Sequence, residues 1–300
     1  MRGNKMIGFL WIIIAVCLIA ILFYKLNDGN KRKYIAISDN RVEADASSKA
    51  LQLSNSYTFS TSEINSVDIQ LTHESLYISK SADDKVYVEL YTSVQDTPKV
   101  TINNNILKIE SEKMKLHFGI FSNHKVIVKL PENIELSDFD ADVTSGSVHI
   151  DDLNLEQADI KSASGSIHLN NCKFIFADLK SQSGSVNIQN CNIDELEAKS
   201  SSGGIKATGD FNKLDLQTIS GSVNADVSTP LTKNSEIQST SGLVHLRVPS
   251  DSGMDIKYSC ISGTYHNRIT ETSGKHGNET VNSGGPKVEL RTTSGSIYVN

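Results

Sequence analysis

Apolar and polar residues alternate with period two through most of the chain beyond residue 57, and this alternation predicts β-strands. Up to residue 130 the alternation is broken into short runs, among them residues 67–71, 86–90 and 126–130. Clusters of Asp, Asn and Pro between the runs are typical of turns. Residues 57–138 are therefore expected to form an irregular, strand-rich first part of a larger sheet system.

The second half of the chain repeats a short unit, marked by a Ser-Gly dipeptide whose first three intervals are 19 residues long. The repeated glycines are Gly146, Gly165, Gly184, Gly203, Gly221, Gly242, Gly263 and Gly295. Apolar residues stand two and four places after most of these glycines, and five and seven places before most of them. Residues 139–300 therefore predict an all-β fold, a parallel β-helix or β-solenoid, with one rung per unit and equivalent residues stacked about 4.8 Å apart.

The repeated glycines are expected at a corner of each rung, where glycine can adopt φ > 0 and the flanking serines can bond to the backbone. Apolar pairs such as Leu153/Leu155 and Cys172/Phe174 indicate a short third inward side and a triangular rung. The interval of 32 residues before Gly295 indicates an irregular rung or an inserted loop. Because the chain ends at Asn300, directly after a rung strand, we expect the C-terminal end of the coil to be poorly capped.

Residues 7–24 form an uncharged apolar run of 18 residues, which as a helix would span about 27 Å, close to the thickness of a membrane. No small-residue cleavage site follows, so residues 1–26 are interpreted as a cytoplasmic stub and a signal anchor, with a cleaved signal peptide as the alternative. Lipidation of Cys17 is a second alternative, although Val16 stands where a lipobox requires a small residue. The charges on either side of the run do not decide its orientation.

Residues 27–56 are polar and read as a spacer that separates the membrane from the solenoid of residues 57–300. Long C-terminal domains are translocated largely regardless of charge, so we expect the bulk of the chain outside the cytoplasm of a bacterial cell. The basic cluster at residues 31–33 could contact anionic headgroups if it lay at the inner leaflet.

Net charge and cysteine content exclude several classes of partner. A formal net charge of −6 gives no basic field, so nucleic acid is not an expected ligand. Four cysteines are too few for a disulfide scaffold, and none has the spacing of a zinc site. Cys172 and Cys191 occupy equivalent inward positions; packed thiols are favoured there, and a disulfide is the alternative.

Two rows of charge flank an inward position and are therefore expected to face outward. The acidic row contains Asp159, Asp178, Glu197 and Asp215, and the row two residues further on contains Lys161, Lys180 and Lys199. Stacked carboxylates repel each other, and a parallel row of lysines relieves that repulsion through solvated ion pairs. Calcium bound by the carboxylates is the alternative, which the neighbouring lysines disfavour.

Candidate chemistry is otherwise sparse. His149 and His168 should stack on adjacent rungs, and a two-histidine metal site would need a third ligand that the spacing does not supply. Asn171 and Asn190 likewise share one position and could form an amide ladder. The chain contains no nucleophile elbow, zinc-protease, Walker or dinucleotide motif, so it predicts no catalytic residue, cofactor or metal site.

Three features together carry a resemblance to a known family: the N-terminal apolar run, the phrase at residues 130–136 (LPENIEL) and the recurring Ser-Gly-Ser-(Val/Ile)-x-(Ile/Leu). They resemble a bacterial family of adhesin-like proteins with β-strand repeats, which includes LiaG-like membrane proteins of envelope-stress operons. The resemblance covers residues 57–300 and implies an envelope protein, with a possible link to stress signalling and no catalytic signature.

We therefore expect a non-enzymatic, membrane-anchored binding or scaffold protein whose ladders face an envelope glycan or another protein. Self-assembly through open solenoid ends is one alternative, and a glycan-active β-helix enzyme is another.

Overall fold

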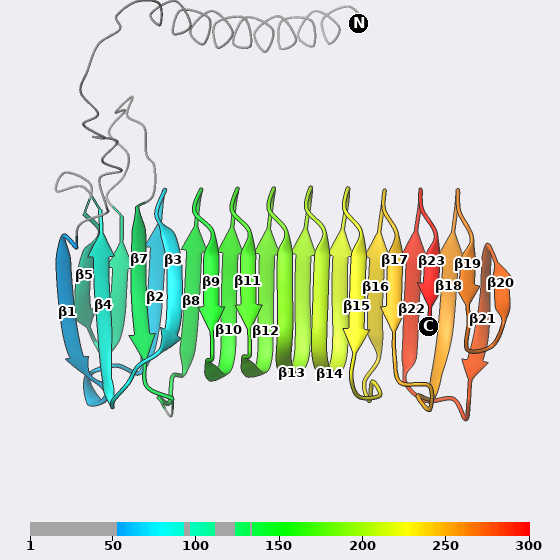
Figure 1. Cartoon of the computed structure of the whole chain (residues 1–300), viewed down its shortest axis with the longest axis horizontal. Helices are drawn as coiled ribbons and strands as arrows, with labels where there is room; N and C mark the ends of the chain where they lie inside the picture. The colour runs from blue at the N-terminus through cyan, green and yellow to red at the C-terminus, as the bar shows by residue number, and fades with distance from the viewer. Residues whose placement is uncertain (1–52, 93–96, 112–123, 133) are drawn as a thin grey trace, which may run out of the picture. The chain divides into compact units, whose positions relative to one another are not determined.

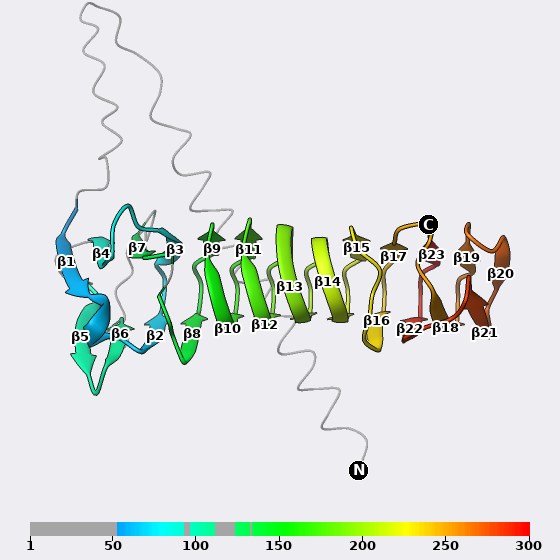
Figure 2. The ribbon, with the colours of Figure 1, turned by 90° about the horizontal axis from the view of Figure 1, so that it is seen from below.

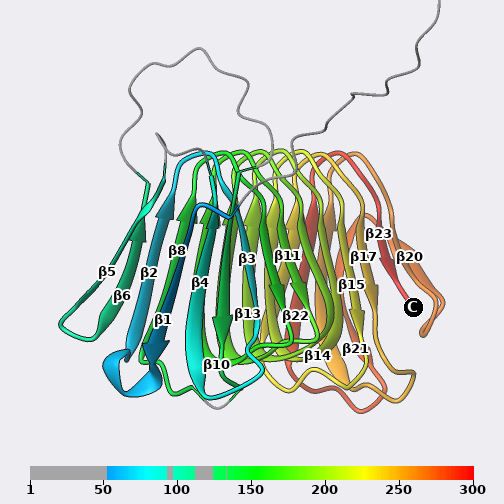
Figure 3. The ribbon, with the colours of Figure 1, turned by 60° about the vertical axis from the view of Figure 1, so that its left-hand side comes forward.

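The computed structural model describes residues 53–92, 97–111, 124–132 and 134–300. These residues form one β-solenoid, whose strands stack side by side along a single long axis (Figure 1). Viewed obliquely, the rungs wind around a common interior (Figure 3). The described residues include one short 3-10 helix, η2 (Thr61–Glu63).

Two long walls of strands make up each rung, and the Ser-Gly corners join them. Wall A precedes the corners and contains, in spatial order, β5 (Lys99–Asn103), β6 (Ile106–Glu110), β2 (Ser66–Leu71), β8 (Asp138–Val143), β10 (Asn154–Ser162), β12 (Lys173–Ser181), the second halves of β13 (Val186–Ser200) and β14 (Ile205–Thr218), β16 (Ser235–Ser239), β22 (Lys287–Thr292), β18 (Met254–Cys260) and β21 (His276–Val281).

Wall B follows the corners. It contains, in spatial order, β1 (Asn55–Ser60), β4 (Lys85–Tyr91), β7 (Lys125–Leu130), β3 (Ser75–Lys80), β9 (Val148–Asp151), β11 (Ile167–Asn170), the first halves of β13 and β14, β15 (Val223–Val227), β17 (Val244–Arg247), β23 (Ile297–Val299), β19 (Tyr265–Asn267) and β20 (Thr272–Gly274). Both walls run the length of the solenoid.

Alternation of side chains places the core between the walls. In β8 the residues Phe139, Ala141 and Val143 are buried, whereas the aspartates that alternate with them are exposed. Neighbouring rungs pair equivalent residues in parallel register, as Ala158 does with Ala177. The predicted all-β solenoid and its 19-residue register are therefore confirmed for this part of the chain, with a core of mostly aliphatic side chains.

The glycines of the Ser-Gly corners are required by close stacking of the rungs. None of the eight has a positive φ, so the expectation of a left-handed conformation at these positions is wrong. A Cβ atom at Gly165 would lie 1.9 Å from the carbonyl oxygen of Gly146, and one at Gly184 would lie 2.1 Å from that of Gly165. Only glycine leaves room for the backbone of the preceding rung at this corner.

A buried hydroxyl three residues before the glycine fastens each corner to the previous one. Ser181 Oγ accepts the N–H of Gly184 at 2.9 Å and donates to the carbonyl oxygen of Gly165 at 3.1 Å. The same donated bond recurs at Ser162, Ser200, Thr218, Ser239 and Thr292. This column satisfies backbone groups that the close stacking removes from water.

The left-handed conformation occurs at the opposite end of wall B. Asp152, Asn171 and Asn190 have φ of 57°, 54° and 54°, and Gly209 takes the equivalent corner with φ of 149°. Asp and Asn tolerate this region better than other non-glycine residues because their short side chains bond locally. Asn171 Nδ2 also donates to Asp152 Oδ1 at 3.2 Å, which links these two rungs. The amide ladder expected between Asn171 and Asn190 stays a prediction.

The apolar pairs after the second corner face inward, as expected. Leu153 and Cys172 are buried just before β10 and β12, and Leu155 and Phe174 are buried in the first residues of these strands. The triangular shape of the rung stays a prediction.

The C-terminal rung lies inside the stack. Its strands β22 and β23 pair with β16 and β17 on one side, and with β18 and β19 on the other. The expectation that the chain ends at a poorly capped C-terminal end of the coil is therefore wrong (Figure 1). The residues inserted before Gly295 form β20 and β21, which run antiparallel to β19 and β18 and close this end.

The N-terminal end is also built out of chain order. β6 and β7 lie outside β2 and β3, which precede them in the sequence. The antiparallel strands β4, β1 and β5 then extend the two walls. The irregular lead-in therefore continues the same solenoid (Figure 2).

Across the described ranges, no helix has both the length and the apolar character needed to cross a membrane. The membrane anchor predicted at residues 7–24, and the spacer up to residue 52, lie outside these ranges.

Candidate ligand-binding groove

The two predicted charge rows stand side by side on the outer surface of wall A. Parallel register stacks Asp159, Asp178 and Glu197 in one column and Lys161, Lys180 and Lys199 in the next. Each lysine bonds to the acid two residues before it on its own strand; the Lys161 Nζ to Asp159 Oδ2 distance, for example, is 3.0 Å. Gln217 likewise donates to Asp215 at 2.9 Å.

These pairs set the electrostatics of wall A. The hydrogen bond to Asp159 raises the pKa of Lys161, and that to Glu197 raises the pKa of Lys199. Asp140 lies one rung before this series, where Asp142 occupies the lysine position. Burial first, and then the neighbouring carboxylates of Asp159 and Asp138, raise the pKa of Asp140. The wall therefore carries alternating, largely neutralised charge.

A groove runs along wall A beside the Ser-Gly corners. Its volume is about 560 Å³, and it crosses six successive rungs from Asp142 on β8 to Gln238 on β16. Four of the rungs contribute the same three consecutive positions: a long polar side chain, the buried hydroxyl and the residue that follows it. In the rung of β12 these are Lys180, Ser181 and Gln182. The lining is Asp142, Lys161, Ser162, Ala163, Lys180, Ser181, Gln182, Lys199, Ser200, Ser201, Gln217, Thr218, Ile219, Gln238 and Thr240.

The groove offers hydrogen-bond donors more than reactive groups. The buried Ser and Thr hydroxyls are engaged with the backbone, so the donors left for a ligand are the remaining N–H groups of the paired lysines and of the glutamine amides. Ile219, which is 56% exposed, adds one apolar contact. The one carboxylate in the lining, Asp142, lies at the end of the groove, where parallel register places it beside Lys161.

The histidines predicted to stack on wall B do so. The ring centroids of His149 and His168 are 4.6 Å apart with planes 4° from parallel, and Tyr77 stacks on His149 at 4.8 Å. Burial lowers the pKa of His149, and the neighbouring His168 lowers it further. Among the described residues, no group of three His, Cys, Asp or Glu side chains is placed to hold a metal ion. Sequence reasoning missed Tyr77, which lies in the irregular lead-in.

Cys172 and Cys191 face inward and are free thiols in the structure. The N–H of Cys172 lies 3.4 Å from Cys191 Sγ. The neighbouring Cys191 and burial raise the pKa of the Cys172 thiol. The arrangement is that of packed thiols.

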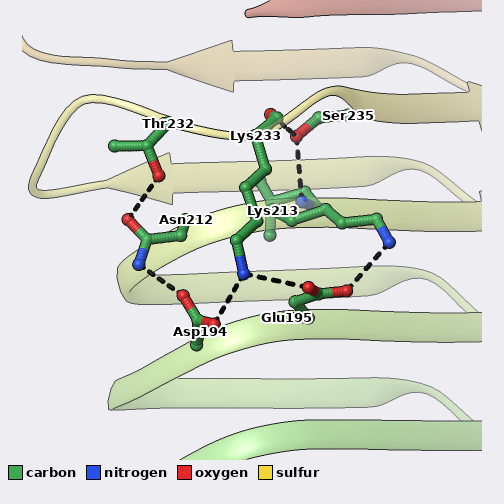
Figure 4. A network of polar contacts seen from close by, with 8 residues as sticks. Asp194, Glu195, Asn212, Lys213, Thr232, Lys233 and Ser235 are labelled. Atoms are coloured by element: carbon green, nitrogen blue, oxygen red, sulfur yellow. Dashed lines mark hydrogen bonds and ion pairs between the residues drawn. The ribbon is translucent and has the colours of Figure 1, made fainter.

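A second polar network binds the loop between β15 and β16 to residues of β13 and β14 (Figure 4). Lys233 Nζ contacts Asp194 Oδ2 at 2.7 Å and Glu195 Oε1 at 2.9 Å, while Lys213 holds the other oxygen of Glu195 at 2.9 Å. Asn212 donates to Asp194. These bonds lower the pKa of both acids, and the network joins three rungs.

Comparison with known proteins supports the fold. A protein from Parabacteroides distasonis, described as a proposed lipid-binding protein, has 16% identity and a TM-score of 0.54, with 82% of this chain and 96% of that chain covered. A proposed adhesin from Bacteroides fragilis has 16% identity and a TM-score of 0.44, with the same coverage of each chain. None of the curated proteins matches the sequence.

A family model matches residues 64–300, from the segment before β2 to the C-terminus. This match covers all of the Ser-Gly repeats and most of the lead-in, and it confirms the resemblance to adhesin-like proteins at the level of the family. The chain therefore belongs to the Toastrack DUF4097 family.

Proposed function

We propose that this chain is a non-enzymatic binding protein of the bacterial cell envelope, which holds an extended ligand along the groove of wall A. The observation that carries the proposal is the repetition of the groove: the rungs of β10, β12, β13 and β14 each contribute the same three lining positions. A surface that repeats every ~4.8 Å suits a ligand that is itself a chain of repeated units.

The chemistry of the lining favours a hydroxyl-rich chain such as a glycan. Lysine and glutamine side chains supply donors, which match the ether, hydroxyl and carbonyl oxygens of a glycan. Each lysine is paired with a carboxylate on its own strand, so the groove has little net field to attract a polyanion.

The location in the proposal rests on the sequence. The apolar run at residues 7–24 has the length of a membrane helix, and the spacer that follows would tether the solenoid to the outer face of the cytoplasmic membrane. Structural relatives described as an adhesin and a lipid-binding protein are compatible with a binding role rather than a catalytic one. A link to envelope stress belongs to the same proposal through the family resemblance.

Binding is tested with the full chain in detergent micelles, by co-sedimentation with purified cell-wall glycan. We expect Lys180→Met to weaken binding about tenfold, the effect of one lost charge-assisted hydrogen bond of ~1.5 kcal/mol. Lys206→Met is the matched control, because Lys206 projects from wall B, away from the groove. Absence of binding, or equal effects of both substitutions, would contradict the assignment of the groove, and turnover of the glycan would contradict the non-enzymatic role.

Orientation is tested in intact cells with an impermeant thiol reagent. The variant has its native cysteines replaced and carries Ser47→Cys in the spacer. Labelling without lysis is the expected result. Protection until lysis would place the solenoid in the cytoplasm and redirect the search to cytoplasmic partners.

A further inference from the structure

The C-terminal end of the solenoid is closed by a polar plug. Glu279 lies on β21, the outermost strand of wall A at this end. It stands opposite the buried Ile256 and therefore points inward. Its carboxylate accepts hydrogen bonds from Tyr265, Asn267 and Thr270. An inward-pointing charge on an edge strand is a device that prevents another sheet from adding to that edge. This end is therefore protected against association.

The N-terminal end has the opposite character. Its outermost strands are β1 on wall B and β5 on wall A (Figure 2). Their inward side chains, Tyr57 and Phe59 on β1 and Val100 and Ile102 on β5, pack on the core but remain partly exposed. The core of the solenoid is therefore apolar and incompletely covered at this end.

The outer edge of β1 also lacks the usual protection of edge strands. Residues 55–60 read NSYTFS and contain no charge and no proline, the residues that blunt exposed edges. β1 pairs with β4 and β5 pairs with β6, and within the described ranges no strand pairs with the other edge of either. Two unpaired edges and a partly open core thus coincide at one end.

We propose that the N-terminal end is an interface between two copies of this chain, which join head to head through β1. In the described ranges wall B has four strands outside β9 and wall A has three outside β8, so β1 stands one strand beyond β5. A two-fold axis perpendicular to the walls would pair β1 antiparallel with the β1 of the second copy, an isologous contact that continues wall B. It also covers Tyr57 and Phe59 with their own counterparts.

Two copies fit together better head to head than head to tail. A head-to-tail contact would place the apolar end against the polar plug at Glu279. The position of the proposed membrane anchor also favours a head-to-head contact; this step rests on the proposed function. The anchor and spacer precede β1, and a random coil of about 30 residues would reach ~30 Å, so two copies in one membrane could bring these ends together.

The test is the oligomeric state of the full chain in detergent, measured by light scattering over a range of concentrations. Wild-type protein should be a dimer. Thr58→Lys should weaken dimerisation at least about tenfold, because Thr58 is exposed on β1 and the new charges would face each other across the axis. Asn278→Lys on β21 is the matched control at the opposite end and should leave the dimer intact.

Disulfide cross-linking is a second test of the same interface. Thr58→Cys, in a variant without the native cysteines, should form a disulfide-linked dimer in membranes under mild oxidation, and Asn278→Cys should not. A protein that is monomeric at every concentration would overturn the proposal, as would a dimer indifferent to Thr58→Lys. A monomer whose Cys at position 58 reacts only after deletion of residues 27–50 would assign this end to the spacer of the same chain. Glycan binding by the groove is measured separately, so failure of either proposal leaves the other standing.

Discussion

Replacement of Gly203 by alanine tests how the Ser-Gly corners hold the rungs together. Gly203 and Gly204 are neighbours in one turn, and neither has a positive φ. A Cβ atom at Gly203 would lie 2.1 Å from the carbonyl oxygen of Gly184, whereas one at Gly204 would lie 3.1 Å from that of Ser222. The two positions therefore separate close contact from backbone freedom as the reason for glycine.

The cost at Gly203 follows from the distances. Raising the contact from 2.1 Å to a tolerable 3.0 Å requires the two rungs to separate by about 0.9 Å at the corner. The hydrogen bonds from Ser201 N–H to Ser181 and from Ser202 N–H to Gln182 are 3.2 and 3.1 Å long and would stretch to about 4 Å, beyond bonding distance. With the bond from Ser200 Oγ, three bonds of ~1 kcal/mol each are lost, so we expect Gly203→Ala to cost about 3 kcal/mol.

Urea unfolding followed by circular dichroism measures this cost. A loss of ~3 kcal/mol corresponds to a fall in melting temperature of about 6–12 °C for a domain of this size. Gly204→Ala should change the free energy of unfolding by no more than ~1 kcal/mol, because alanine also restricts the unfolded chain. Equal losses at the two positions, or no loss at Gly203, would refute the argument from close contact.

Three further measurements probe the interior. Ser200→Ala removes a buried hydroxyl that serves two backbone groups and should cost about 1–3 kcal/mol in urea unfolding, whereas Ser200→Thr should retain most of the stability. Glu74→Ala should cost at least ~2 kcal/mol by the same assay, because this fully buried carboxylate accepts two backbone N–H groups and the hydroxyl of Ser111. Burial raises the pKa of Glu279, but hydrogen bonds from neighbouring side chains outweigh it and lower the pKa below its ordinary 4.5. The ionised form is thus favoured in the folded state, so its stabilisation is present above pH 4.5 and lost as pH falls through the folded-state pKa; the melting temperature of Glu279→Gln should lack this acid-dependent fall.

Periodicity predicts the middle of this fold well because every rung there repeats the same local choices. The inward positions of β8, β10 and β12 and the outward ladders follow from alternation and spacing alone. The column of Ser181 and Ser200 was also visible, as a Ser or Thr three places before the glycine, but its role depends on the rung-to-rung distance. The same distance, rather than φ, explains the glycines. Spacing along a chain does not report how closely two backbones approach.

The groove and the aromatic stack were less accessible to sequence reasoning for a related reason. The groove arises where long Lys and Gln side chains stand beside short corner residues, so it depends on side-chain size at positions that the repeat leaves free to vary. Tyr77 joins the stack with His149 although it lies outside the regular repeat, because β3 pairs with β9 across 72 residues of sequence. Pairing between distant segments is what a local pattern cannot specify.

The order of rungs at the two ends shows why such distant pairing is needed. A solenoid whose rungs followed the sequence would finish each end with a bare parallel strand in each wall. Here the chain passes beyond the position of its last rung, forms β18 and β19 with the antiparallel caps β21 and β20, and returns to place β22 and β23 inside. The terminal strands gain a partner on both sides, while the charged cap occupies the end. At the N-terminal end the same construction finishes in uncharged, partly exposed β1. Since one end shows that this fold can protect an edge, the unprotected end has the character of an interface.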